Sequence, residues 1–203
     1  MKPWLLAHLK CPACEEDSRL TVQVSEWRKG EIYAGSLECG AGHGFAIRNH
    51  IADFVLPRDA LAERSHVYDV LWEAHVRRAY GGRIDEYRGK FQAFARLPEP
   101  IEVYFKGKRV LDAGCVEGRF SYLAGALGAE HVVGVDYSRE ALHRAMIGTG
   151  NPPNCSFIRA DILNLPLRRT FDYVFSVGVL HHAPETREAY QAIVRHLKVG
   201  GYI

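Results

Sequence analysis

Four residues near the N-terminus have side chains and a spacing that suit a metal ion. They lie in Cys11-Pro-Ala-Cys14 and Cys39-Gly-Ala-Gly-His43, which together form a C-x₂-C … C-x₃-H pattern. Three thiolates and one imidazole can complete a tetrahedral zinc site, and four protein ligands leave no position open for a substrate. We therefore predict a structural zinc ion at Cys11, Cys14, Cys39 and His43. Free thiols around a hairpin without metal are the alternative, and His8 and His50 are alternative ligands with less suitable spacing.

A second group of residues suits a ligand that contains a nucleoside. Residues 110–120, VLDAGCVEGRF, read as a strand that ends in a carboxylate, a glycine-bearing turn and the start of a helix. Such a turn presents backbone N–H groups at a helix N-terminus, and glycine lets a ligand approach the backbone closely. Asp136 ends the next apolar run, where a carboxylate can accept hydrogen bonds from a ribose diol. The two features together predict a nucleoside-containing cofactor.

The glycine pattern argues against two common nucleotide sites. The dinucleotide fingerprint needs three glycines, but the corresponding positions hold Gly114, Val116 and Arg119. No Gly-Lys-Ser/Thr follows the turn, so the phosphate-binding P-loop is absent as well. NAD is therefore disfavoured.

The composition sets limits on the class of protein. The chain has 203 residues, is 47% hydrophobic and carries a formal charge of +2, which excludes a mainly disordered, collagen-like or membrane-spanning chain. The near balance of charge gives no reason to expect nucleic acid or a membrane as an obligatory partner. Five unevenly spaced cysteines suggest metal ligation or free thiols rather than disulfides. We read no signal peptide and no transmembrane segment, so a cytoplasmic protein is expected.

The hydrophobic pattern indicates the elements that position these residues. In the first part of the chain, Leu20 to Ser25 alternates apolar and polar side chains, as a half-buried strand does. From Lys108 onward, apolar runs alternate with helix-like segments, which predicts a parallel sheet with helices on both faces. The expected strands are at 20–25, 32–37, 45–47, 155–162 and 171–180, with a turn at 27–30. The first expected helix starts at Asp59 and ends at Gly81-Gly82, and the next runs from Asp85 to Leu97. The last expected helix runs from 185 to 198 and is ended by Gly200-Gly201.

Five motifs in order resemble those of class I S-adenosylmethionine-dependent methyltransferases of the type 11-like group. They are DAGCVEG, GVDYS, FIRADILNLPL, FDYVFSVGVLHHAPE and LKVGGYI. The resemblance implies that S-adenosylmethionine is the cofactor, with Asp112 and Gly114 beside its methionine part, Asp136 at its ribose, and Asp161-Ile162 at its adenine. The full cofactor set that it implies is Asp112, Ala113, Gly114, Cys115, Gly118, Asp136, Tyr137, Ala160, Asp161, Ile162, Ser176 and Val177.

The resemblance does not identify a catalytic residue. Methyl transfer depends on alignment of the acceptor and exclusion of water. His181 and His182 follow the fourth strand of the core and are weak candidates for a general base; we favour a role in shaping the loop. Val116 stands where the family has its middle glycine. The valine would weaken cofactor binding, shift the cofactor, be tolerated if its side chain turns away, or mark a site that has lost its ligand. Cys115 is interpreted as a packed thiol rather than a nucleophile.

The N-terminal segment resembles two zinc modules. CPAC and GFAIRNHIADFVLP resemble the zinc ribbon of the tRNA-methyltransferase activator family, and C-x₃-H is similar to the Cys₃His module of bacterial 23S rRNA guanine methyltransferases. LHHAPE more closely resembles small-molecule methyltransferases. We therefore expect methyl transfer to a small-molecule acceptor. The alternatives are an RNA methyltransferase that uses the ribbon to contact RNA and a non-catalytic, degenerate scaffold module.

The predicted organisation has three parts. They are a zinc-ribbon-like domain at 1–57, a helical linker or cap at 58–98 and an S-adenosylmethionine-binding core at 99–203. The expected fold class is α/β, a Rossmann-like class I methyltransferase sheet behind a small β domain. The family core has seven strands, and the motifs place the end of this chain where the fifth begins. An open parallel edge is prone to pairing, so we expect a fragment of a longer protein or association that covers the edge.

Overall fold

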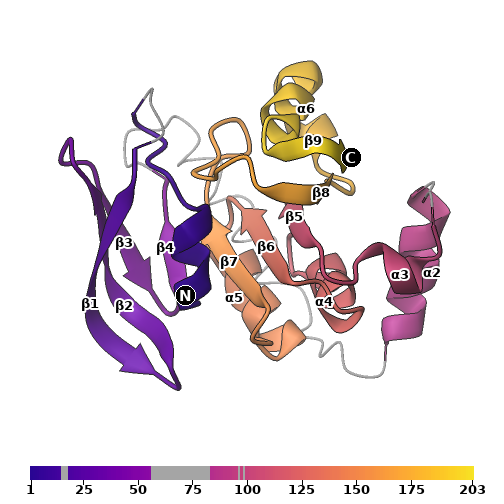
Figure 1. Ribbon diagram of the computed structural model, residues 1–203, viewed down its shortest axis with the longest axis horizontal. Coiled ribbons are helices and arrows are strands. Elements are labelled where there is room, and N and C mark those ends of the chain that lie inside the picture. The colour runs from indigo at the N-terminus through magenta and orange to yellow at the C-terminus, as the bar shows by residue number, and fades with distance from the viewer. Residues whose placement is uncertain (15–17, 56–82, 96, 98) are drawn as a thin grey trace.

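The described residues of the computed structural model are 1–14, 18–55, 83–95, 97 and 99–203. Their strands form one mixed sheet in the order β1-β2-β3-β4-β7-β6-β5-β8-β9 (Figure 1). The expected α/β, Rossmann-like class is confirmed, whereas the helix expected from Asp59 lies outside the described residues. The strands are β1 Leu20–Arg28, β2 Glu31–Cys39, β3 Gly44–Arg48, β4 Ile51–Asp53, β5 Arg109–Ala113, β6 His131–Asp136, β7 Cys155–Arg159, β8 Phe171–Phe175 and β9 Leu197–Tyr202.

The parallel part of the sheet is arranged around β5. Strands β6 and β8 pair with β5 on its two sides, both parallel to it. The strand order therefore reverses at β5, and ligands in open α/β sheets bind outside the carboxyl ends of the strands at such a point. The glycine-bearing turn begins directly after β5, at this edge.

Helices and short turns cover both faces of the parallel strands. Val110 and Leu111 are neighbours on β5 and point to opposite faces; Val110 packs in a core with Leu123, and Leu111 packs in another with Leu5 and Ile193. None of the helices that the structure describes is long and apolar enough to cross a membrane. The helices are α2 Ile84–Phe94, α3 Ile101–Tyr104, α4 Arg119–Ala126, α5 Arg139–Thr149 and α6 Thr186–Val194, with 3₁₀ turns η1 Pro3–His8 and η2 Leu180–His182.

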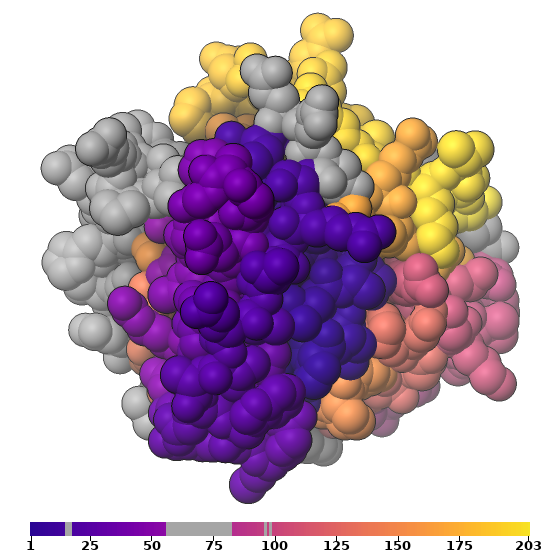
Figure 2. All heavy atoms as spheres, turned by 60° about the vertical axis from the view of Figure 1, so that its left-hand side comes forward, coloured from indigo at the N-terminus to yellow at the C-terminus, as the bar shows by residue number. Residues whose placement is uncertain are grey.

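The N-terminal strands extend the same sheet. Strands β1 to β4 pair antiparallel in sequence, and β4 then pairs parallel with β7 through Ala52↔Ile158 and Asp53↔Arg159. Leu37 and Phe45 share one buried core with residues of the parallel part. Figure 2 shows the indigo and violet N-terminal residues lying directly against salmon and orange residues of the later chain.

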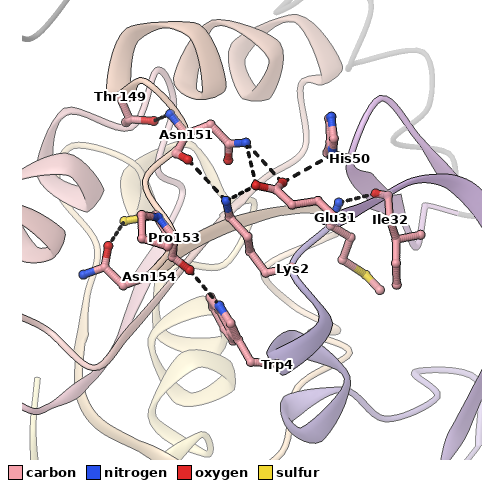
Figure 3. Close-up of polar contacts among 11 residues, drawn as sticks. Lys2, Trp4, Glu31, Ile32, His50, Thr149, Asn151, Pro153 and Asn154 are labelled. Atoms are coloured by element: carbon pink, nitrogen blue, oxygen red, sulfur yellow. Dashed lines mark hydrogen bonds and ion pairs between the residues drawn. The ribbon is translucent and has the colours of Figure 1, made fainter. Parts of the chain in front are cut away.

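Polar contacts fix the first residues of the chain to the parallel strands. Lys2 and Asn151 converge on the Glu31 carboxylate, with Asn151 Nδ2 at 3.1 and 3.2 Å from its two oxygens (Figure 3). Trp4 Nε1 donates to the Pro153 carbonyl at 2.9 Å, and its ring stacks on His131 at 4.0 Å. The bonds to Asn151 and Pro153 join residues about 120 to 150 positions apart in the chain.

The structure confirms the three N-terminal strands but moves several other boundaries. β4 and η1 were not expected, and the helix from Asp85 ends at Phe94 rather than Leu97. The strand expected at 171–180 ends at Phe175, because a turn with Gly178 at φ 72° and then η2 follow.

The prediction that Gly200-Gly201 end a helix was wrong. The helix ends at Val194, and both glycines lie in β9, which pairs with β8. A Cβ on Gly201 would lie 2.8 Å from the Asp172 carbonyl oxygen. The glycine therefore allows close approach of neighbouring strand backbones.

Candidate functional site

The Cys/His cluster has the geometry of a tetrahedral metal centre. The ligand atoms of Cys11, Cys14, Cys39 and His43 lie within 4.8 Å of one another. Cys14 Sγ is 3.8 Å from Cys39 Sγ, and His43 Nδ1 is 3.4 to 3.7 Å from the three sulfurs. Zinc–sulfur bonds of about 2.3 Å in a tetrahedron place sulfurs roughly 3.8 Å apart. The donor set and its spacing therefore fit zinc.

The local backbone prepares one of these thiols for ligation. Burial raises the pKa of Cys39, but backbone N–H groups of His43 and Ala41 and the His43 ring more than compensate and lower it to about 6. Burial raises the pKa of Cys11 to about 11. Metal ligation requires thiolates, so the ion itself must supply the charge that favours ionised Cys11.

Two glycines after β5 are required by packing. Gly114 has φ 80°, and a Cβ there would lie 2.4 Å from a methyl carbon of Val179. Gly118 has φ 75°, and a Cβ there would lie 2.9 Å from that of Ala145 on α5. Only glycine adopts these conformations without strain. The turn is thereby held close to the loop that follows β8.

Asp136 is oriented at the carboxyl end of β6. Its Oδ2 accepts a hydrogen bond from the Val116 N–H and its Oδ1 accepts one from the Ser138 N–H, both at 2.9 Å. An ionised carboxylate only accepts hydrogen bonds, and it is the type of group that binds a ribose diol at the end of such a strand. Val116 makes its bond at φ 52°, the left-handed conformation that suits the family's glycine.

Asp112 and Cys115 are turned into the protein. Ser121 Oγ donates to Asp112 Oδ2 at 2.7 Å, and burial raises the pKa of this carboxyl to about 7. Burial also raises the pKa of Cys115 well above its ordinary value, and the residue packs with Leu142 and Phe157. The structure thus supports a packed thiol at 115 and links β5 to α4 through Asp112.

The segment after β7 lies beside Asp136. The Ala160 N–H donates to the Asp136 carbonyl at 3.1 Å, and Asp161 Oδ1 accepts from the Leu163 N–H at 2.9 Å. Ile162 is half-buried and packs against the core. Tyr137, next to Asp136, accepts a bond from Arg159 at its carbonyl. The residues expected at the ribose and adenine are therefore brought together.

The end of β8 contributes a polar atom that fits a bound group. Ser176 Oγ is buried and has no hydrogen-bond partner within the described residues. Buried hydroxyls are normally paired, so a ligand atom at this edge would satisfy it. Val177 packs on the aromatic core, and Ala113 is fully buried on β5.

The two histidines lie farther along the same loop. His181 and His182 are exposed on η2, with ring centroids 4.0 Å apart. A general base must reach the acceptor in the bound complex, so a role of either histidine in proton transfer stays a prediction.

Sequence reasoning missed one pair of residues at this edge. Asp53 on β4 forms an ion pair with Arg159 on β7 at 3.1 Å. The two lie 106 positions apart, and the motifs that contain them, GFAIRNHIADFVLP and FIRADILNLPL, do not indicate that they pair. Their proximity depends on β4 joining the sheet.

The family comparison agrees with this architecture. Residues 110–201 match the family model described as "Methyltransferase domain". This stretch contains β5 through most of β9, with the glycine turn, Asp136, Asp161 and Ser176. The stretch is therefore similar to a methyltransferase domain.

The names of similar proteins point to different substrates. A tRNA U34 carboxymethyltransferase from Pseudomonas aeruginosa (strain LESB58) is 29% identical over 185 residues, covering 79% of this chain and 57% of that protein. A ubiquinone biosynthesis O-methyltransferase from Paraburkholderia phymatum is 34% identical over 103 residues, covering 49% of this chain and 44% of that protein. A crystal structure of an S-adenosylmethionine-dependent methyltransferase from Mesorhizobium loti is 29% identical, with a TM-score of 0.47, covering 57% of this chain and 50% of that one. The chain spans about half the length of these proteins.

Proposed function

We propose that this protein binds S-adenosylmethionine and transfers its methyl group. The observation that carries the proposal is Asp136, an acceptor that two backbone N–H groups orient at the carboxyl end of β6, beside the topological switch point at β5. The match of residues 110–201 to a methyltransferase domain supports it. The Ser176 hydroxyl, which has no hydrogen-bond partner among the described residues, supports a bound group at the same edge.

Each part of the edge has a role in this proposal. Asp136 accepts the ribose hydroxyls, Asp161 and Ile162 flank the adenine, and the turn at Gly114 lies beside the methionine part. The cofactor supplies an activated methyl group on a sulfonium. The protein aligns an acceptor behind that methyl and excludes water.

The Cys/His cluster is proposed to hold a structural zinc ion. Its four donors complete a tetrahedron, which leaves no open position for catalysis. The ion would stiffen the segment that contains Cys11 and the β2–β3 turn, which lie far apart in sequence.

The proposed acceptor is a small molecule. Its support is the LHHAPE loop and the similarity to a ubiquinone biosynthesis O-methyltransferase, together with a formal charge of only +2. RNA is the second candidate, and the specific observation in its favour is the tRNA-modifying relative, whose similarity extends over 79% of the chain.

Calorimetric titration with S-adenosylhomocysteine tests the cofactor assignment. The unchanged protein should bind in the micromolar range, and Asp136→Ala should weaken binding at least tenfold because the ribose loses its acceptor. Asp85→Ala, at a side chain that is 87% exposed on α2, is the matched control and should bind normally. A folded protein without detectable binding would overturn the proposal.

Transfer of a tritiated methyl group distinguishes the acceptors. The protein is incubated with labelled S-adenosylmethionine and either the small-molecule fraction of a cell extract or total RNA. Label in the first fraction supports the proposed acceptor, whereas label in RNA alone overturns it in favour of the second candidate. No transfer to either by cofactor-binding protein would favour a non-catalytic module.

A further inference from the structure

Three neighbouring strands place charged residues in one row beside the proposed cofactor. Asp53 on β4 is the register partner of Arg159 on β7, which in turn is the register partner of Asp136 on β6. Both strand pairs of this row are parallel, so the row lies at the carboxyl edge. Register partners in a sheet project to the same face at a strand spacing of about 4.8 Å. Arg159 therefore lies between two acidic residues.

The guanidinium of Arg159 is committed to Asp53. Its Nη1 donates to both Asp53 oxygens, at 3.1 and 3.3 Å, and both side chains are only 12% exposed. Its Nε donates to the Tyr137 carbonyl at 2.9 Å. Arg159 thus ties Asp53 to the residue that follows Asp136.

Other bonds hold Asp53 in place. The Phe54 N–H donates to the Arg159 carbonyl at 2.8 Å, and the Val55 N–H donates to Asp53 Oδ1 at 3.2 Å. Arg139, the first residue of α5, forms a second ion pair with Asp53. The carboxylate therefore balances two cations at the edge where the nucleoside would bind.

We propose that Asp53 is a positioning residue for the cofactor, acting through Arg159. The Asp53 carboxylate holds the Arg159 guanidinium toward β4. It thereby keeps the guanidinium from pairing with the Asp136 carboxylate, which must receive the ribose. The N-terminal module, by which we mean residues 1–55 with strands β1 to β4, thereby becomes part of the cofactor site. None of its residues needs to touch the cofactor. The inference rests on the proposed function.

Removal of the Asp53 charge has a specific expected consequence. The substitution removes the carboxylate that holds the Arg159 guanidinium, and the nearest remaining acid in the row is Asp136. Arg159 would then compete with the ribose hydroxyls for the same carboxylate. A purely structural role for Asp53 would instead lower stability without a selective loss of cofactor affinity.

Titration calorimetry with S-adenosylhomocysteine tests this proposal. Asp53→Asn should weaken binding at least tenfold, and Asp53→Glu should restore it to within about threefold of the unchanged protein. Glu38→Gln, an exposed acid on β2 of the same module, is the control and should bind normally. The double variant Asp53→Asn/Arg159→Gln should bind more tightly than Asp53→Asn, because the cation in the same row as Asp136 is gone.

The outcomes separate this inference from the proposed function. If Asp53→Asn binds within twofold of the unchanged protein, the positioning role is overturned and the proposed function stands. If the unchanged protein does not bind, both fall. Thermal unfolding of each variant shows whether it folds. If Asp53→Asn does not fold, the double variant, which lacks both charges, still tests the proposal.

Discussion

Val116 adopts a backbone conformation that β-branched residues rarely take. Its φ of 52° crowds the branched Cβ against its own backbone, and such strain costs about 1–3 kcal/mol. The N–H that this conformation directs at Asp136 is the compensating contact. At the residue scale, the departure from the family's glycine changes the side chain while the glycine-like backbone is retained.

Val116→Gly should stabilise the protein or leave it unchanged. Relief of strain is offset by the greater freedom of glycine in the unfolded chain, which costs up to about 1 kcal/mol, so the net gain should be about 0–2 kcal/mol. Urea unfolding measures it. Val199→Gly, at a 91% exposed strand residue without positive φ, is the control and should destabilise. Equal destabilisation by both variants would show that Val116 is not strained.

At the element scale, α2 is attached to the core by one face. Phe91 is 3% exposed, and its ring lies 5.2 to 5.6 Å from those of Phe105, Phe120 and Phe175. Phe94, one turn later, is 63% exposed. The helix therefore depends on the aromatic core beneath it.

Phe91→Ala should destabilise the protein by about 3–5 kcal/mol, the usual cost of removing a buried aromatic ring. Phe94→Ala removes the same atoms from the same helix and should cost less than about 1 kcal/mol. Urea unfolding of the two variants gives the comparison. Similar losses would mean that α2 is not anchored as described.

η1 is anchored by a pair of neutral histidines. His8 Nδ1 lies 2.9 Å from Thr170 Oγ1, and its Nε2 lies 3.2 Å from His131 Nδ1. Burial, and next the neighbouring His131, lower the pKa of His8 to about 4. Burial also lowers the pKa of His131.

Stability should therefore fall on acidification. An unfolded His8 takes up its proton near pH 6.5, whereas the folded one does so near pH 4. Between these values the unfolded state binds more protons, so the stabilisation is complete above about pH 6.5 and is lost as the pH falls toward 4. The melting temperature of His8→Asn should depend less on pH in this window. His143→Asn, at an exposed histidine, should keep the original slope.

At the scale of the whole molecule, the Cys/His module is joined to the parallel sheet. Strand β4 pairs with β7, and residues of both parts share one buried core. The segment after η1 also contacts the loop after β7, where the Lys10 N–H donates to the Pro166 carbonyl at 3.0 Å. Disorder at the module would therefore spread to the core.

Removal of the metal should lower the stability of the entire chain. Zinc at 100 times its dissociation constant contributes about 2.7 kcal/mol, which corresponds to roughly 5–10 °C in melting temperature for a chain of this length. Metal analysis measures the zinc content, and circular dichroism measures the melting temperature, before and after chelation. Cys14→Ser should behave like the chelated protein. His50→Asn, which alters the alternative ligand, should retain one zinc ion. Full zinc content in Cys14→Ser would contradict the assigned ligands.

The sequence by itself determined the features that depend on local spacing. The two cysteine-bearing turns, the glycine turn and Asp136 at a strand end were predicted because each lies within a few residues of the element that positions it. Alternating hydrophobicity likewise predicted the N-terminal strands. The conformation of Val116 was not predictable, since its glycine-like φ is imposed by its surroundings.

Only the tertiary structure decided how the two parts meet. The pairing of β4 with β7, the ion pair of Asp53 with Arg159 and the strand at Gly200-Gly201 all join segments far apart in sequence. Such contacts leave no local pattern, because a strand of three residues or a single charge becomes specific only when a partner edge is presented to it. The physical reason is that burial and hydrogen bonding in a sheet are satisfied collectively, across strands, once the chain has folded.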